Sequence, residues 1–333
     1  MCIVVAKYFP EIGWVGVKNR DRNYIPEISF KQNVNNGVET LLFWDDITQY
    51  NEGMNSGGVC IVSASLMVLD DEKEITTRSK TPSKDGAKLK KALKFPNVKA
   101  AAMSLIKSKL PGNTLIFDKD TCYLLEGAWK TGGYADKEYK YKIREIPHDK
   151  TIARTNHGVW LEGTGYQHNP DNTAEALSRV SSESRLAIAE YVVDNAENPQ
   201  AIIDGLARTY INEPQLNCLR TAHNKKQMRT TSQLMMIPSE RTMFVRPVQS
   251  HMTFNFWQMN NPKKDLWIEI LGNRVLYQQK EEAGTTGETT AAANRQSRRE
   301  RPEVGRVPGA CFGQAGSGQV RGPRRGLWPG QRR

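Results

Sequence analysis

The sequence predicts an α+β layered fold, in which sheets and helices occupy separate layers. Runs of β-branched and apolar residues dominate the N-terminal part of the chain, and stretches with helical spacing interrupt them. Strand-like runs return after Arg229. A doubly wound parallel sheet would alternate strands and helices regularly, so the order strands, helices, strands favours the layered α+β class.

The first element is a β-hairpin that begins at the N-terminus. Residues 2–6 form a short β-branched run, and Gly13–Val17 forms a second one. Pro10 lies between them as the turn residue. We therefore expect the second strand to return beside residue 2.

The remaining elements follow from the same patterns. Six strands are expected next, at Glu39–Phe43, Val59–Leu69, Asn113–Phe117, Thr121–Glu126, Tyr139–Ile146 and Thr151–Arg154. Four helices are expected from the spacing of Ala, Leu, Lys and Glu, at Gly86–Leu93, Asn97–Leu110, Ser182–Asp194 and Pro199–Thr209. Four strands complete the fold, at Thr231–Met236, Thr242–Pro247, Met252–Trp257 and Leu266–Leu271.

The composition changes near Gln279, which divides the 333-residue chain into a folded domain, residues 1–278, and a tail, residues 279–333. Within the tail, residues 291–333 carry ten Arg against two Glu, which accounts for +8 of the net charge of +11. A segment so poor in apolar residues is expected to be disordered. One explanation of its arginines is contact with RNA or DNA phosphates. A disordered linker, or an extension that is out of frame or fused, explains the same composition equally well.

The remaining charge of +3 over residues 1–290 does not demand a nucleic-acid groove. The longest apolar stretch, Gly57–Leu69, is too short to span a bilayer, and no signal peptide pattern opens the chain. Five scattered cysteines without a C-x-x-C pair indicate neither disulfides nor zinc. We therefore expect a cytoplasmic protein without a metal or cofactor. The sequence leaves open whether the chain forms a homo-oligomer.

The most informative residue is Cys2, because removal of the initiator Met would place a thiol and a free α-amine on one residue. An α-amine has an ordinary pKa of about 7.7 to 8.0, so part of it is neutral near pH 7 and can accept the thiol proton. Such a nucleophile needs no histidine partner. The alternative is that a cysteine stands at position 2 by chance.

The end of the second predicted strand brings polar residues toward Cys2. If the hairpin forms, Asp21 meets the N-terminus, where its carboxylate could hold the α-amine. A nearby cation would favour the thiolate. Without that context, residues 19–23 are typical of a polar loop.

Four pieces of this sequence, in this order, resemble the N-terminal-nucleophile hydrolases that cleave linear amides. They resemble in particular choloylglycine hydrolases, penicillin V acylase and the isopenicillin N acyltransferase group. The resemblance spans roughly residues 2 to 275. It rests on Cys2, Asn19-x-Asp21, Thr155-Asn156 and Ser181-Ser182-x-Ser184-Arg185.

The resemblance implies a four-layer αββα sandwich, two antiparallel sheets flanked by helices, and it implies roles for single residues. Cys2 is similar to the family's nucleophile and Asp21 to its carboxylate at the α-amine. Asn156 resembles the amide donor of the oxyanion hole, and Arg185 resembles the Arg beside the thiol.

Two positions depart from the family's pattern. The turn Met54–Gly58 matches a family turn and places Ser65 at the backbone oxyanion donor, where the family commonly has Asn or Tyr. A backbone donor is insensitive to its side chain. Lys18 stands where many relatives have Arg. The lysine keeps the positive charge but lacks the planar guanidinium group that can donate two parallel hydrogen bonds.

The resemblance therefore implies a cysteine amidohydrolase, or an acyltransferase, that cleaves a non-peptide carbon–nitrogen bond of a small-molecule amide through a thioester on Cys2. Two alternatives stay open. One is a non-catalytic protein of the same fold, for binding or assembly through the basic tail. The other is the group of Asn-Arg-Asp-Glu proteins related to transport and Golgi organisation factors, from which Arg22 departs in place of Glu.

Overall fold

The structure is a computed structural model. It describes residues 2–35, 37–66, 84–129, 138–161, 164–165, 173–210, 212, 216–220, 228–248, 253–254, 266–271 and 274–279. For residues 173–178 and for those beyond 248, only the backbone is described. Contacts divide the chain at residue 282, and all described residues belong to the first unit. The predicted tail beyond Gln279 lies outside the described residues.

A seven-stranded sheet carries the N-terminus. Its centre is the hairpin of β1 (Ile3–Phe9) and β2 (Gly13–Arg22), which pair from Ile3–Asn19 to Phe9–Gly13, as the sequence predicted. The order is β10-β1-β2-β11-β12-β14-β15 and all described pairs are antiparallel. The other strands are β10 (Ile152–Arg154), β11 (Arg229–Ile237), β12 (Thr242–Pro247), β14 (Leu266–Leu271) and β15 (Arg274–Gln279).

The second sheet has eight strands in the order β13-β3-β4-β5-β6-β7-β8-β9. Neighbours are antiparallel, except that the two-residue strand β13 runs parallel to β3 at the edge. The strands are β3 (Glu27–Asn35), β4 (Val38–Asp45), β5 (Asn51–Asn55), β6 (Cys60–Ala64), β7 (Gly112–Phe117), β8 (Cys122–Trp129), β9 (Tyr139–Glu145) and β13 (Thr253–Phe254).

Three apolar cores follow from the alternation of side chains along each strand. Val4 and Ala6 of β1 point into the core between the sheets, whereas Ile3 and Val5 point to the opposite face. That face packs on α4 (Thr173–Asn195) and α5 (Pro199–Ala207). The outer face of the eight-stranded sheet packs on α2 (Lys84–Ala92) and α3 (Val98–Lys107).

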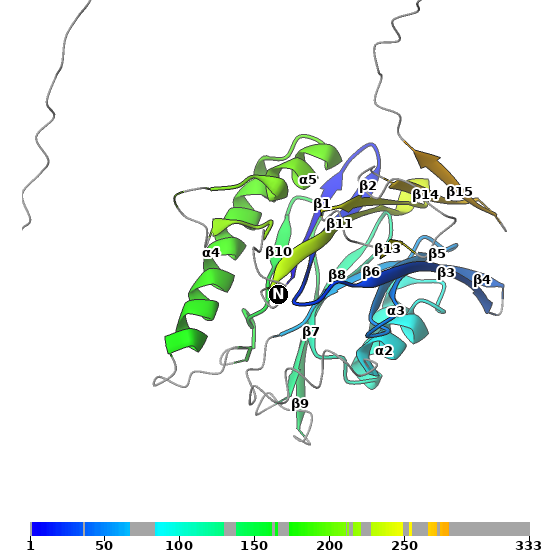
Figure 1. The fold of residues 1–333 in the computed structure, drawn as a ribbon. Helices are drawn as coiled ribbons and strands as arrows, with labels where there is room; N and C mark the ends of the chain where they lie inside the picture. Colours follow the sequence, from blue (N-terminus) through cyan, green and yellow to red (C-terminus); the bar gives the residue numbers. More distant parts are fainter. Residues whose placement is uncertain are drawn as a thin grey trace, which may run out of the picture. The chain divides into compact units, whose positions relative to one another are not determined.

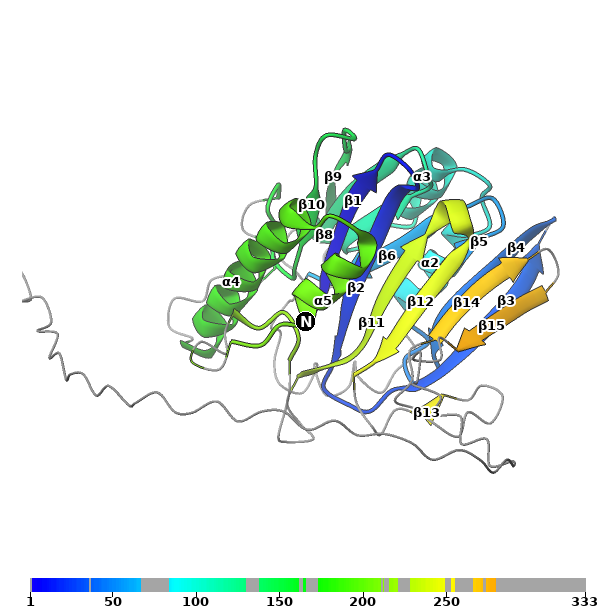
Figure 2. The ribbon, with the colours of Figure 1, turned by 90° about the horizontal axis from the view of Figure 1, so that it is seen from above.

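The layers are therefore helices, sheet, sheet, helices. Figures 1 and 2 show α4 and α5 on one side of the two sheets and α2 and α3 on the other. The predicted α+β sandwich of two antiparallel sheets flanked by helices is confirmed, with the β13–β3 pair as a parallel exception. Among the described residues, no helix has the length and apolar character needed to cross a membrane.

Several elements differ from the sequence prediction. Strands β3, β5 and β15 were not expected, and β5 reads Asn-Glu-Gly-Met-Asn, a composition depleted in strands. Helix α4 begins at Thr173 instead of Ser182. Ser182 therefore lies inside the helix and not at its start, and its Oγ accepts a hydrogen bond from the backbone N–H of Asn156 at 3.2 Å. The last part of the predicted strand Val59–Leu69 lies outside the described residues.

Gly13, at the turn of the first hairpin, offers a test of this packing. Its φ is +82°, and a Cβ there would lie 2.2 Å from the backbone oxygen of Lys119. Gly37 is a matched control, because its φ is +78° and a Cβ there would meet nothing within 4 Å. We expect Gly37→Ala to cost about 1–2 kcal/mol of unfolding free energy from the backbone alone.

We expect Gly13→Ala to cost about 1–3 kcal/mol more than Gly37→Ala, because the displaced atom belongs to the backbone and not to a flexible side chain. Urea unfolding of both variants measures the difference. Equal losses in the two variants would show that the hairpin turn does not pack against Lys119 as described.

Candidate active site

The hairpin places Cys2 at the inner surface of the seven-stranded sheet. Cys2 belongs to the core between the sheets, together with Val4 and Ala6, and is 6% exposed. Its side chain therefore points toward the eight-stranded sheet and away from α4.

The strand next to β1 brings Asn156 to the same end of the sheet as Cys2. β1 and β10 pair Val4 with Arg154 and Ala6 with Ile152. Cys2 directly precedes β1, and Asn156 follows the end of β10 by two residues. Because the two strands are antiparallel, the start of β1 and the end of β10 lie at the same end of the strand pair.

The thiol of Cys2 contacts the far end of β2. Its Sγ lies 3.6 Å from Nη1 of Arg22 and 3.9 Å from the backbone oxygen of Asp21. The same Nη1 donates a hydrogen bond of 2.7 Å to that oxygen. The guanidinium that touches the sulfur is therefore that of Arg22, a residue for which the sequence analysis expected no role at the thiol.

Alternation along β2 places three cations on the face that Cys2 shares. Lys18, Arg20 and Arg22 point between the sheets and meet Glu52 of β5 and Asp45 of β4. We call these five side chains the charge cluster. All have fully buried side chains except Arg22, which is 13% exposed.

Ion pairs connect every member of the charge cluster. Lys18 pairs with Glu52 and donates a 2.6 Å hydrogen bond to the backbone oxygen of Ser63. Arg20 lies 3.6 Å from Glu52 and 3.3 Å from Asp45, and Nε of Arg22 lies 3.6 Å from Asp45. Buried charges are tolerated only when they are paired in this way.

The electrostatics of the charge cluster act on the thiol. Burial alone would raise the pKa of Cys2, but the positive charges of Lys18, the chain's amino terminus and Arg22 outweigh it, and the pKa lies below its ordinary value. Burial would also raise the pKa of Glu52 and Asp45, and the neighbouring cations hold both below their ordinary values. Three cations thus face two carboxylates, and the excess of positive charge favours the thiolate over the thiol.

The opposite face of β2 holds Asp21. Its Oδ1 accepts a 2.7 Å hydrogen bond from Thr230, and its Oδ2 lies 3.7 Å from both Arg185 and Arg220. The sequence analysis expected Arg185 beside the thiol, whereas the ion pair recorded for it is with the carboxylate of Asp21. Asp21 reaches Cys2 through its backbone oxygen.

The loop after β10 is fixed around Asn156. Nδ2 of Asn156 donates a 2.6 Å hydrogen bond to the backbone oxygen of Ser65, so the structure brings these two predicted residues together. Nδ2 of Asn113, on β7, donates to the backbone oxygens of Thr155 and His157 at 3.0 and 3.1 Å. Asn113 therefore holds the backbone on both sides of Asn156, and the hydrogen bond to Ser65 holds its side chain.

A buried carboxylate extends this support. Glu126 of β8 accepts hydrogen bonds from the backbone N–H groups of Val159, Trp160 and Leu161, at 2.6 to 3.2 Å. The sequence analysis missed Glu126, Asn113, Glu52 and Asp45. Glu126 is a polar residue inside an otherwise apolar strand, a signal that does not identify its partner, and the other three have no distinguishing signal in the sequence.

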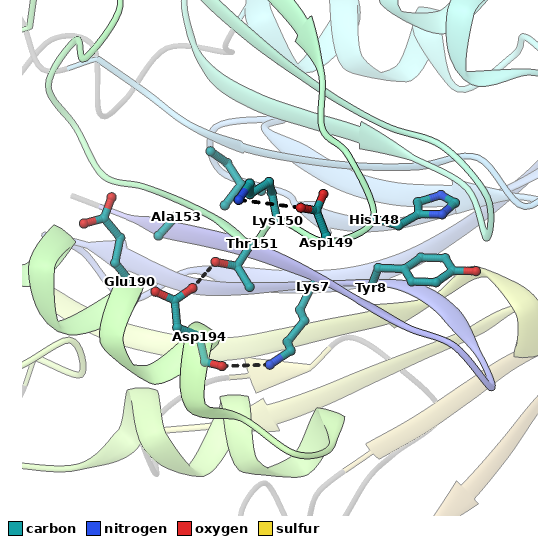
Figure 3. Close-up of a pocket in the computed structure, with 10 residues that line it drawn as sticks. Lys7, Tyr8, His148, Asp149, Lys150, Thr151, Ala153, Glu190 and Asp194 are labelled. Atoms are coloured by element: carbon teal, nitrogen blue, oxygen red, sulfur yellow. Dashed lines mark hydrogen bonds and ion pairs between the residues drawn. The ribbon is translucent and has the colours of Figure 1, made fainter.

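A separate cavity of about 530 Å³ lies at the other end of β1 (Figure 3). Lys7 and Tyr8 line it together with residues 148–153 and two acids of α4. Five residues separate Lys7 from Cys2, or about 17 Å along an extended strand. Lys7 donates to the backbone oxygen of Asp194 at 2.9 Å, so this cation is bound to the C-terminal turn of α4 and not to the thiol.

No protein-family profile and no curated protein sequence matches the chain. Among solved structures, penicillin V acylase from Agrobacterium tumefaciens is similar, with 12% identity, a TM-score of 0.45, and coverage of 80% of this chain and 86% of that one. Two variants of conjugated bile acid hydrolase from Clostridium perfringens are also similar, with 13% identity and TM-scores of 0.43 and 0.42. Each comparison covers 84% of this chain and 97% of the hydrolase chain.

The lowered pKa of Cys2 predicts a distinct pH profile for its alkylation. A free thiol has a pKa of about 8.5, and only the thiolate reacts. We expect the rate at which iodoacetamide modifies Cys2 to rise with pH to a plateau. The midpoint of this rise should lie at a lower pH in the folded protein than in the urea-unfolded chain. Peptide mapping by mass spectrometry measures the rate at each cysteine.

The other described cysteines are internal controls. Burial raises the pKa of Cys60, Cys122 and Cys218, the last to about 12, so these thiols are expected to stay unmodified in the folded protein at neutral pH. A midpoint for Cys2 at or above that of the unfolded chain would contradict the electrostatic description of the site.

Proposed function

We propose that this chain is a cysteine amidohydrolase, or an acyltransferase, which cleaves a linear non-peptide carbon–nitrogen bond through a thioester on Cys2. The proposal requires removal of Met1, which frees the α-amine of Cys2. The observation that carries it is the position of Cys2, whose thiol lies beside the guanidinium of Arg22 and at the same end of the β1–β10 pair as Asn156.

The first half of the reaction forms the thioester. The thiolate of Cys2 attacks the carbonyl carbon of the amide, and the electron pair of the carbonyl bond moves to its oxygen. When the tetrahedral intermediate collapses, the carbon–nitrogen bond breaks. The protonated α-amine gives its proton to the leaving nitrogen, which departs as a neutral amine.

The oxyanion needs donors that are already in place. An asparagine side chain carries two N–H bonds. One N–H of Asn156 is used by the backbone oxygen of Ser65, which leaves the second for the oxyanion. The backbone N–H of Ser65 is the second proposed donor. Fixed donors of this kind avoid the reorganisation that water would require.

The second half releases the acyl group. The neutral α-amine takes a proton from a water molecule, which attacks the thioester and yields the free acid and the thiolate. If an amine replaces water, the same attack yields a new amide. The acceptor therefore decides between hydrolysis and acyl transfer.

Substitution of Asn156 tests the proposal. Loss of one oxyanion donor costs roughly 10²–10³ in rate, so we expect Asn156→Ala to lower kcat by that factor on any amide that the wild type cleaves. A panel of N-acyl amino acids with detection of the released amine provides the measurement. The control is Asn35→Ala on the edge strand β3, which we expect to keep wild-type turnover.

Wild-type turnover in a folded Asn156→Ala variant would remove this residue from the site. Amine release that persists in Cys2→Ser would remove the thioester mechanism altogether. If no amide in the panel is cleaved and Met1 is retained, the non-catalytic interpretation of the fold replaces the proposal.

A further inference from the structure

We propose that Arg22 is the cation that contacts the sulfur of Cys2 directly and, together with the field of Lys18, stabilises its thiolate. This inference deepens the proposed function and rests on it, because the thiolate is the nucleophile of that reaction. Nη1 of Arg22 lies 3.6 Å from this sulfur.

Lys18 is engaged elsewhere. Its ammonium group pairs with Glu52 and donates to the backbone oxygen of Ser63 at 2.6 Å. A lysine ammonium is a compact point charge with three donors, and two of them are directed at these oxygens. Lys18 therefore contributes to the field at the thiol without a recorded hydrogen bond to it.

Arg22 is held in position on three sides. Nη1 donates to the backbone oxygen of Asp21 at 2.7 Å, Nε lies 3.6 Å from Asp45, and the guanidinium lies 5.5 Å from the centre of the Tyr50 ring. A planar guanidinium can satisfy several partners at once, which an ammonium at the same place could not do. The contact with the sulfur thus belongs to a fixed arrangement.

The other charged groups around Cys2 also act on it. Lys18 and Arg20 of β2 and the chain's amino terminus are positive, whereas Asp21, Asp45 and Glu52 are negative. Arg185 and Arg220 both lie 3.7 Å from the carboxylate of Asp21, on the opposite face of β2. Arg20 lies between Asp45 and Glu52, and Arg185 contacts Asp21, so each is compensated by a carboxylate. Arg22 is the cation that combines a carboxylate partner with direct contact to the sulfur.

The test is the pH profile of Cys2 alkylation in the full-length protein, with iodoacetamide as the probe. An opposite charge within about 4–6 Å shifts a pKa by 1–3 units, so we expect Arg22→Gln to raise the midpoint by about one unit or more. At pH values well below both midpoints, where the rate is proportional to the thiolate fraction, the rate should then fall about tenfold. Arg22→Lys, which keeps the charge, should raise the midpoint less.

Arg144→Gln is the matched control. Arg144 lies on β9, with its guanidinium 4.8 Å from the Trp160 ring, and we expect its loss to leave the midpoint unchanged. If Arg22→Gln fails to fold, Arg22→Gln combined with Asp45→Asn removes the charges of both partners, and the midpoint should still rise. An unchanged midpoint in a folded variant without Arg22 overturns the inference.

The outcome is separable from that of the proposed function, because alkylation needs no amide substrate. A raised midpoint in Arg22→Gln supports the inference even if no amide is cleaved. Amide cleavage that depends on Cys2, with a midpoint insensitive to Arg22, would keep the proposed function and overturn the inference.

Discussion

Three cations of one strand, Lys18, Arg20 and Arg22, lie buried between the two sheets and meet Glu52 and Asp45 from the facing sheet. Removal of one partner of such an ion pair would leave the other charge unpaired in an apolar core and would lower the free energy of unfolding by about 3–5 kcal/mol. The charge cluster therefore fixes how the sheets face each other. It also surrounds Cys2 with an excess of positive charge, so the same contacts that align the sheets favour the thiolate.

The register of β2 is what makes this arrangement possible. A shift by one residue would turn the three cations toward α4 and bring Asp21 between the sheets. Pairing on both sides of β2 maintains the register, with Ile3 opposite Asn19 on β1 and Leu234 opposite Lys18 on β11. One strand thus presents cations to the thiol on its inner face and a carboxylate to Arg185 on its outer face.

The sequence predicts those parts that depend on local pattern. The hairpin that joins Cys2 and Asp21 is local, and its pairing is confirmed. Strand β5 was not predicted, because its residues are depleted in strands and the ion-pair partners of Glu52, Lys18 and Arg20, lie on the other sheet. The contact of Arg22 with the sulfur depends on the same distant pairing, which no window of sequence contains.

The most direct measurement is the intact mass of the purified full-length protein before and after exposure to a β-lactam, whose strained amide acylates nucleophiles. The account predicts that Met1 is absent and that a single acyl adduct forms, maps to Cys2, and is missing in Cys2→Ser. A retained Met1, or an adduct that persists in Cys2→Ser, would contradict the central claim that an N-terminal cysteine is the nucleophile.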